Sequence, residues 1–350
     1  MSLFLLLYLV LLSPVNENLY TTLVDVAYSC YFTWCYYHLF SKHYTCSLLN
    51  MVSTGDLSKE VDFEAYRCLF PLQYFERLLT DSVRPDARQL QQARDTTLAL
   101  GAVGCANGSA LAKIGSTTML SAIKMEIMTP TAELPDEGNI AIEFHLPPIC
   151  SPIVRPGRPA EAAQVISKQL SDTILSSGMI NLKELSLVSG KAAWMAYLDI
   201  YCLDSDGALF DAALLSAVAA FSHLRIPVVS LNDEGRVVIL AEDDTERKMG
   251  EEAVNKEKRK LNLSNIPFSL TCILHKNYIL ADPTSEEESV METTVTVVLN
   301  DSHQLVSLYK SGGSILLYTS ALQECVAITR QRLKELRSIL DDALSEMEVD

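Results

Sequence analysis

The chain has 350 residues, of which 49% are hydrophobic and 21% charged, and its formal net charge is -16. This length and composition fit a folded globular protein with room for two domains and a large buried core. The acidic charge argues against a free-standing nucleic-acid-binding protein, because neutralising phosphates requires lysine and arginine. Any contact with RNA must therefore use a local basic patch or a larger assembly.

Nine cysteines are spread widely along the chain, and none of them lies in a Cys-x-x-Cys pair. We interpret them as buried thiols in a reducing compartment, because several lie in apolar runs. Zinc ligands usually come in closely spaced pairs, and such pairs are missing from this sequence. A phosphate-binding loop needs a glycine spacing that "KSGGS" (310–314) lacks. The sequence therefore predicts no metal and no cofactor.

Residues 1–57 differ in composition from the rest of the chain. The apolar run at 3–12 is too short for a transmembrane helix of about 20 residues, and no lysine or arginine precedes it, as one would in a signal peptide. Three interpretations stay open, namely a secretory signal, a membrane-associated segment, or a segment foreign to the fold. We favour the third, with Met51 as the natural start, because the composition changes at "MVSTGDLSKEVD".

Residues 64–230 are predicted to form a first domain of strands and helices. Turn residues separate the apolar segments, with Asn107-Gly108 and Gly115-Ser116 expected to close two successive hairpins. In chain order we expect a helix from Pro71, an extended or turn segment at 84–88, three strands within 95–127, a strand at 140–148, a helix after Pro159, a strand at 192–204, and a helix starting at Asp211.

Residues 261–347 are predicted to form a second domain that follows a charged loop at 241–260. The loop contains seven acidic and six basic residues, which is typical of an exposed segment. Apolar strands then resume, and a long helix ends the chain. The expected elements are strands at 267–275, 278–282, 293–299 and 305–311, and a helix at 318–347. Since both halves place strands before a helix, we expect a duplicated α+β unit.

Five short motifs follow one another along the chain. They are "RPDAR" (84–88), "GSALAKIGSTTML" (108–120), "HLPPICS" with "RPGRPAEAAQV" (145–165), "LDSDGALFDAA" (203–213) and "ADPTSEEE" (281–288). In this order and spacing, residues 64–346 resemble the PH-type ribonuclease family, in the branch that forms the hexameric ring of the RNA exosome. Ala87 departs from the family, which usually has glycine in the fourth place of the first motif.

The resemblance implies an α+β fold, the duplicated PH-ribonuclease fold, with mixed sheets and packed helices of the ribosomal protein S5 domain 2-like type. Active members of the family cleave RNA from its 3′ end with phosphate as the attacking group, and they need an acidic residue near the scissile bond. Alignment of the strand after the acidic motif puts Thr294 in that place, and a hydroxyl cannot act as a carboxylate. We therefore predict no catalytic residues, with an active phosphate-dependent 3′–5′ exoribonuclease as the alternative.

Glu286, Glu287 and Glu288 match the acidic motif of the non-catalytic branch, and we interpret them as a solvated loop after Asp282-Pro283. Neighbouring glutamates on an extended segment point in alternating directions, so they do not converge on a metal ion. A lone histidine such as His145, before Leu146-Pro147, is more typical of a structural role.

The predicted RNA-binding residues are four arginines near these motifs: Arg84, Arg88, Arg155 and Arg158. The last two precede the helix near Ala160, where a helix N-terminus with adjacent arginine can bind an anion, although a plain surface loop stays open. The first two line an RNA path or a subunit interface, or else form a local ion pair with Asp86 or Asp81.

The resemblance implies other PH-type ring subunits, S1/KH cap proteins and single-stranded RNA as partners, and no membrane. It also implies the nucleus, including the nucleolus, and the cytoplasm as locations, and a role in rRNA maturation and mRNA turnover. The alternative from a different functional class is a membrane or secreted protein, for which residues 1–50 would supply the targeting or membrane segment.

Overall fold

The fold is taken from a computed structural model. The structure describes residues 64–151, 154–155, 157, 160–231, 237–239, 252–253, 259–291, 293–313 and 318–349. The predictions for residues 1–57, and for most of the charged loop at 241–260, lie outside these residues. No helix among the described residues is both long enough and apolar enough to span a bilayer.

The chain divides into two compact units, Met1–Tyr74 and Phe75–Asp350. A short helix covers residues 64–69, and helix α4 (Pro71–Thr80) follows it. Helix α4 begins at the predicted proline, whose fixed φ and missing N–H suit the first turn of a helix. Residues 84–88 come next and contain a turn, which is one of the two conformations expected there.

The larger sheet of the second unit has six strands in the order β1-β2-β3-β6-β4, with β5 also paired to β6. Only the β4–β6 pair is parallel, so the sheet is mixed, as expected. The Gly115-Ser116 hairpin is confirmed, since Ile114 pairs with Thr117. The strands are β1 (Thr96–Leu100), β2 (Gly108–Ile114), β3 (Thr117–Met128), β4 (Asn139–His145), β5 (Ser186–Val188) and β6 (Ala192–Asp204).

The prediction that Asn107-Gly108 closes a tight hairpin is wrong. Leu100 pairs with Ala110, so the connection is a longer loop, and neither Asn107 nor Gly108 has a positive φ. Asn107 instead accepts a hydrogen bond from the backbone N–H of Met125 at 2.9 Å. A Cβ on Gly108 would lie 2.7 Å from the Ala220 carbonyl oxygen, so glycine is needed there for close packing of strand against helix.

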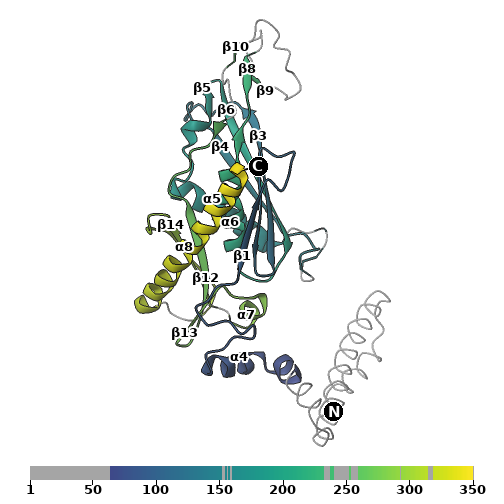
Figure 1. The fold of residues 1–350 in the computed structure, drawn as a ribbon, viewed down its shortest axis with the longest axis vertical. Helices are drawn as coiled ribbons and strands as arrows, with labels where there is room; N and C mark the ends of the chain where they lie inside the picture. Colours follow the sequence, from purple (N-terminus) through teal and green to yellow (C-terminus); the bar gives the residue numbers. More distant parts are fainter. Residues whose placement is uncertain are drawn as a thin grey trace, which may run out of the picture. The chain divides into compact units, whose positions relative to one another are not determined.

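Two helices cover one face of this sheet. Helix α5 (Glu161–Ser177) packs on β4, and its predicted apolar positions Ile166, Leu170 and Ile174 are buried. Helix α6 (Leu209–His223) starts two residues before Asp211, the predicted start, and is buried on nearly every side. It packs on β2 and β3 and also on β12 of the second sheet, so a helix rich in alanine lies between the two sheets (Figure 1).

The second sheet has four antiparallel strands in the order β13-β12-β14-β15, and all four were predicted. Helix α8 (Thr319–Val349) packs on this sheet and on β1, with Cys325, Leu333, Leu336 and Leu340 buried and Leu322 partly buried (Figure 1). The strands are β12 (Pro267–His275), β13 (Tyr278–Ala281), β14 (Thr294–Asn300) and β15 (Leu305–Ser311).

The segment between the two sheets contributes only short elements. They are the 3-10 helix η1 (Leu182–Leu185) and the strands β7 (Arg225–Ile226), β8 (Val229–Leu231), β9 (Val237–Ile239), β10 (Glu252–Ala253) and β11 (Arg259–Lys260). Of the six described cysteines, all are free thiols; four are buried, as expected, whereas Cys68 and Cys105 are exposed.

Candidate functional site

The acidic segment after β13 forms a helix, which corrects the prediction of a solvated loop. Helix α7 (Ser285–Val290) begins after the N-cap Thr284, whose side chain accepts a hydrogen bond from the Glu287 backbone N–H. The Glu287 carboxylate in turn accepts from the Thr284 backbone N–H at 3.0 Å. This reciprocal capping box satisfies two helix-end donors, so the three glutamates follow helical rather than alternating directions.

Glu287 holds Arg84 in a buried ion pair. Their side chains are 1% and 0% exposed, and both Arg84 Nε and Nη2 donate to the carboxylate, with 2.9 Å for the Nε contact. The remaining Arg84 donors bond to the carbonyls of Ala281, Asp282 and Gln92. All five guanidinium N–H groups therefore have partners inside the protein, and Arg84 has a structural role rather than an open contact surface. The partner is also neither Asp86 nor Asp81.

The turn that carries Arg84 keeps a strained residue. Ala87 has φ +62°, in the left-handed region where glycine is favoured, and its N–H donates to the Arg84 carbonyl at 2.9 Å. Alanine therefore replaces glycine in this motif without changing the turn, at the cost of backbone strain.

Asp282 forms a second buried pair, with Arg94. Two guanidinium nitrogens of Arg94 donate to the two carboxylate oxygens, at 3.0 and 2.7 Å, and the Arg94 backbone N–H adds a third bond at 2.7 Å. Burial alone would raise the pKa of Asp282, but the bonds and charge of Arg94 outweigh it and the net pKa lies below the ordinary value. Burial would likewise lower the pKa of Arg94, and Asp282 reverses this to a net rise.

Two further acids connect α6 to the second half. Glu288 accepts from the backbone N–H of Ala208, at the start of α6, at 2.9 Å, and burial raises the pKa of Glu288 to about 7. Asp211 in α6 accepts from Ser269 Oγ and the Thr271 N–H of β12, both at 2.6 Å. Burial raises the pKa of Asp211 to about 6. The acids of this region thus join secondary structure elements to each other.

Both halves of the chain match a known family. A family model described as "3' exoribonuclease family, domain 1" (RNase PH) matches residues 92–227, and the model for domain 2 matches residues 265–332. The exosome complex component rrp43 of Schizosaccharomyces pombe is 33% identical over 267 residues, which cover 76% of this chain and 94% of that one. This chain belongs to the RNase PH family. The two matched segments lie inside the predicted domains at 64–230 and 261–347.

Archaeal proteins are also similar to this chain. The exosome complex component Rrp42 of Methanopyrus kandleri is 33% identical and covers 65% of this chain and 79% of that one. A solved structure described as the Archaeoglobus fulgidus exosome with RNA bound to the active site is 29% identical, with a TM-score of 0.65, and covers 76% of this chain and 96% of that one. The duplicated α+β fold is therefore confirmed.

The position predicted to replace the acid of active RNase PH members lies at the start of β14. Thr294 pairs with Ile273 and Ser311 across the sheet, and its Oγ1 donates to the Ser311 carbonyl at 3.1 Å. Its hydroxyl therefore has a backbone partner, and it offers no carboxylate for a proton or a metal.

The other predicted RNA-binding arginines lie in different surroundings. Arg88 is 11% exposed and pairs with Asp86 at 2.5 Å, the local ion pair that stayed open as an alternative, and it also lies 3.6 Å from Asp282. Arg155 is exposed ahead of α5, whose N-cap residue Ala160 makes no side-chain capping bond. Arg158 lies outside the described residues. The structure thus brings Arg84 and Arg88 to one turn, and Arg155 to another part of the RNase PH fold.

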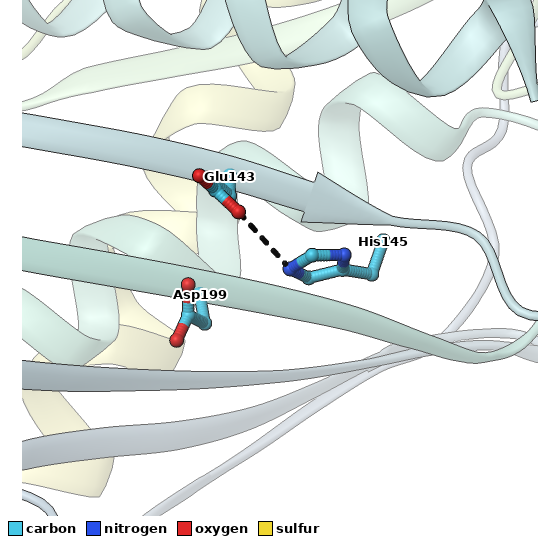
Figure 2. Close-up of side chains that lie close together, drawn as sticks. All are labelled: Glu143, His145 and Asp199. Atoms are coloured by element: carbon cyan, nitrogen blue, oxygen red, sulfur yellow. Dashed lines mark ion pairs between the residues drawn. The ribbon is translucent and has the colours of Figure 1, made fainter. Parts of the chain in front are cut away.

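One group in the described part of the chain could hold a metal ion, and sequence reasoning missed it. Glu143, His145 and Asp199 each offer one ligand atom, and these atoms lie within 4.8 Å of one another (Figure 2). Glu143 and His145 are two residues apart on β4, but Asp199 comes from β6, and only the strand pairing brings it close. No local spacing could have revealed this group.

Proposed function

We propose that this chain is a non-catalytic subunit of the hexameric RNase PH-type ring of the RNA exosome. The observation that carries the proposal is the similarity to proteins named exosome complex components over nearly their whole length, 94% for the S. pombe protein and 92% for Rrp42 of Pyrococcus furiosus. The chain supplies two PH-type domains to such a ring, at 64–230 and 261–347, and supports 3′–5′ RNA processing and degradation by the assembly, including rRNA maturation and mRNA turnover.

The absence of catalysis is supported by the chemistry at the acidic segment. The carboxylates of Asp282 and Glu287 are neutralised by buried arginines, and Glu288 bonds to the backbone at the start of α6. A carboxylate paired with a buried arginine, as in Asp282 and Glu287, cannot accept a proton from a substrate or bind a catalytic metal without breaking the junction. The hydroxyl of Thr294 replaces the acid that active members need.

The proposed partners are other PH-type ring subunits, S1/KH cap proteins and single-stranded RNA, in the nucleus, including the nucleolus, and in the cytoplasm. Arg88, Arg155 and Arg158 are the proposed RNA contacts. Arg84 is left out, because its donors are all engaged inside the fold. The acidic net charge of -16 fits a subunit whose neighbours supply most of the basic lining of an RNA channel.

The test has two parts. The tagged full chain is purified from its own cells, and the co-purifying proteins are quantified by mass spectrometry. Five other PH-type subunits in equal amounts support the ring, whereas recovery alone or as a homo-oligomer contradicts it. The purified chain is then given phosphate and a 3′-labelled RNA; release of nucleoside diphosphates would identify it as an active exoribonuclease instead.

A further inference from the structure

We propose that Glu143, His145 and Asp199 form a binding site for one divalent transition-metal ion, and that Zn²⁺ is the ion that fits this ligand set best. The site lies on the solvent-facing side of the larger sheet, on β4 and β6, and is separate from the acidic junction around Asp282. It does not depend on the proposed function.

Backbone pairing fixes the three residues next to each other. Glu143 stands directly opposite Asp199 in the parallel β4–β6 register. His145 follows Glu143 by two residues, and residues two apart on a strand point to the same face of a sheet. All three side chains therefore share one face, and His145 Nε2 lies 3.7 Å from Glu143 Oε2 (Figure 2).

The distances are close to those of a bound ion. Zinc takes nitrogen and oxygen ligands at about 2.1 Å in a tetrahedron, which places neighbouring donor atoms about 3.4 Å apart. The three donor atoms lie within 4.8 Å of one another, so side-chain rotations alone can close the set around an ion. The Glu143 side chain is 71% exposed, which leaves it room for such a rotation.

Lysine and arginine do not balance the charge at this place within the described part of the chain. Glu143 and Asp199 are neighbouring carboxylates, and in the described part of the chain no lysine or arginine forms an ion pair with either of them. Lys124, on the same face of β3, pairs with Glu126 at 3.4 Å. A divalent cation would convert the repulsion between the two carboxylates into attraction.

The imidazole is oriented for binding. Tyr201 stands opposite His145 in the strand register, and the two rings stack with centroids 4.6 Å apart and an interplanar angle of 21°. This contact holds the ring with Nε2 directed toward Glu143 (Figure 2). Stacking of this kind restricts the rotation of the imidazole ring.

The ligand types select the class of ion. Imidazole favours Zn²⁺ and other transition metals, whereas Mg²⁺ and Ca²⁺ prefer oxygen ligands alone. Three protein ligands leave one tetrahedral position open for water. Because Glu143 and His145 lie on the open face of the sheet and their side chains are 71% and 37% exposed, the ion and that water are reached directly from solvent.

The test uses the full chain, freed of metal with a chelator. Zn²⁺ binding is measured by calorimetry, and Co²⁺ is used as a spectroscopic probe by visible absorption. We expect His145→Ala and Asp199→Asn each to weaken Zn²⁺ binding at least about tenfold, since loss of even an outer-sphere partner typically costs 10- to 100-fold. The Co²⁺ spectrum should show ligand-field bands that the variants lose, without the charge-transfer band of a cysteine thiolate.

Two matched variants control for other binding. Glu126→Gln changes a carboxylate on the same face outside the cluster, and His303→Asn changes an exposed histidine in the turn after β14. Both should bind Zn²⁺ like the unmodified chain, and Zn²⁺ should raise their melting temperatures but not those of His145→Ala and Asp199→Asn. Equal Zn²⁺ affinity in all five proteins, or no binding by the unmodified chain, would overturn the proposal.

Discussion

The junction around Arg84 and Arg94 and the group around His145 use similar residues in opposite environments. At the junction, Asp282 and Glu287 are buried and each faces an arginine fork at hydrogen-bond distance. On the open face of the larger sheet, Glu143 and Asp199 are partly or largely exposed and have no arginine or lysine partner among the described residues. Burial therefore forces neutralisation in the first region, while exposure permits unbalanced charge in the second.

The difference in burial explains why one group of carboxylates stabilises the fold while the other is available to bind an ion. A buried carboxylate must keep a counterion, as Asp282 and Glu287 do, or favour its protonated form, as the raised pKa values of Asp211 and Glu288 show, because an unpaired charge in the interior costs several kcal/mol. A solvated carboxylate loses little when it is left unpaired, so it remains available to an incoming ion. The motif with three consecutive glutamates is accordingly structural. The proposed metal-binding site, by contrast, is formed by residues from two strands that share no sequence motif.

The largest expected effect is loss of the buried pair. Glu287→Ala leaves the Arg84 guanidinium buried without its counterion, and we expect the free energy of unfolding to fall by about 3–5 kcal/mol. The measurement is urea unfolding of the full chain at neutral pH. The neighbouring exposed Glu286 provides the control, and Glu286→Ala should cost about 0.5 kcal/mol or less. Equal losses in the two variants would contradict the structural role of Glu287.

A smaller effect depends on pH. Burial raises the pKa of Glu288 to about 7 from the ordinary value of 4.5, so the folded state favours the protonated form. The resulting stabilisation is complete below about pH 4.5 and is lost as the pH rises through about 7. Glu288→Gln keeps an oxygen that accepts the Ala208 bond but cannot ionise. Between pH 5 and 8 the variant should lose about 1–2 kcal/mol less stability than the unmodified chain.

This pH effect is checked by urea unfolding at several pH values. The pKa of Asp211 is also raised, to about 6. The loss of stability with rising pH should therefore become smaller in Glu288→Gln without disappearing. Asp282 contributes to the pH dependence of stability with the opposite sign. Its pKa is lowered in the folded state, so its ionised form stabilises the fold above its ordinary pKa of 3.8, and this contribution is lost as the pH falls. Identical pH profiles of the variant and the unmodified chain would refute the buried state of Glu288.

The strained turn at the junction gives a still smaller effect of opposite sign. Ala87→Gly removes the strain of φ +62°, and we expect stabilisation by about 0.5–1 kcal/mol after the entropy cost of glycine. Ala162→Gly, at an exposed position inside α5, should instead destabilise by about 0.5–1 kcal/mol. Thermal unfolding compares the two, and destabilisation by Ala87→Gly would show that the turn does not need glycine-like freedom.

The smallest effect concerns the exposed arginine ahead of α5. In the proposed exosome ring, Arg155→Ala should weaken binding of single-stranded RNA two- to fivefold, about 0.4–1 kcal/mol, and lower the salt slope by about 0.7. Arg155→Lys keeps the charge and should retain most of the affinity. Fluorescence anisotropy at several salt concentrations provides the measurement, and an unchanged slope would remove Arg155 from the RNA contacts.

The order of the elements could be read from the sequence because it depends on local patterns. Prolines and turn glycines mark the boundaries of α4 and of the β2–β3 hairpin, and the apolar spacing of Ile166, Leu170 and Ile174 marks the buried face of α5. The errors arose where a local pattern had two solutions. Asn107-Gly108 resembles a turn, but Gly108 is required for contact with Ala220.

The prediction that the three glutamates alternate in direction was wrong for a related reason. Residues after a proline were expected to stay extended, but the capping box of Thr284 and Glu287 begins a helix there. The threonine and the glutamate three residues later were visible in the sequence, and this spacing is the signal that could have predicted α7. The burial of Glu287 was not visible, because its partner Arg84 lies 203 residues away.

The sequence by itself determined the family, the two-part α+β plan and the hydroxyl at 294, because each of these depends on residue order and on local periodicity. Tertiary structure alone decided which charges are buried, since Arg84, Arg94 and Asp211 find their partners across the two halves. It also placed Asp199 beside Glu143 and His145. Contacts between distant segments depend on strand pairing and helix packing, which fix distances that no spacing along the chain records.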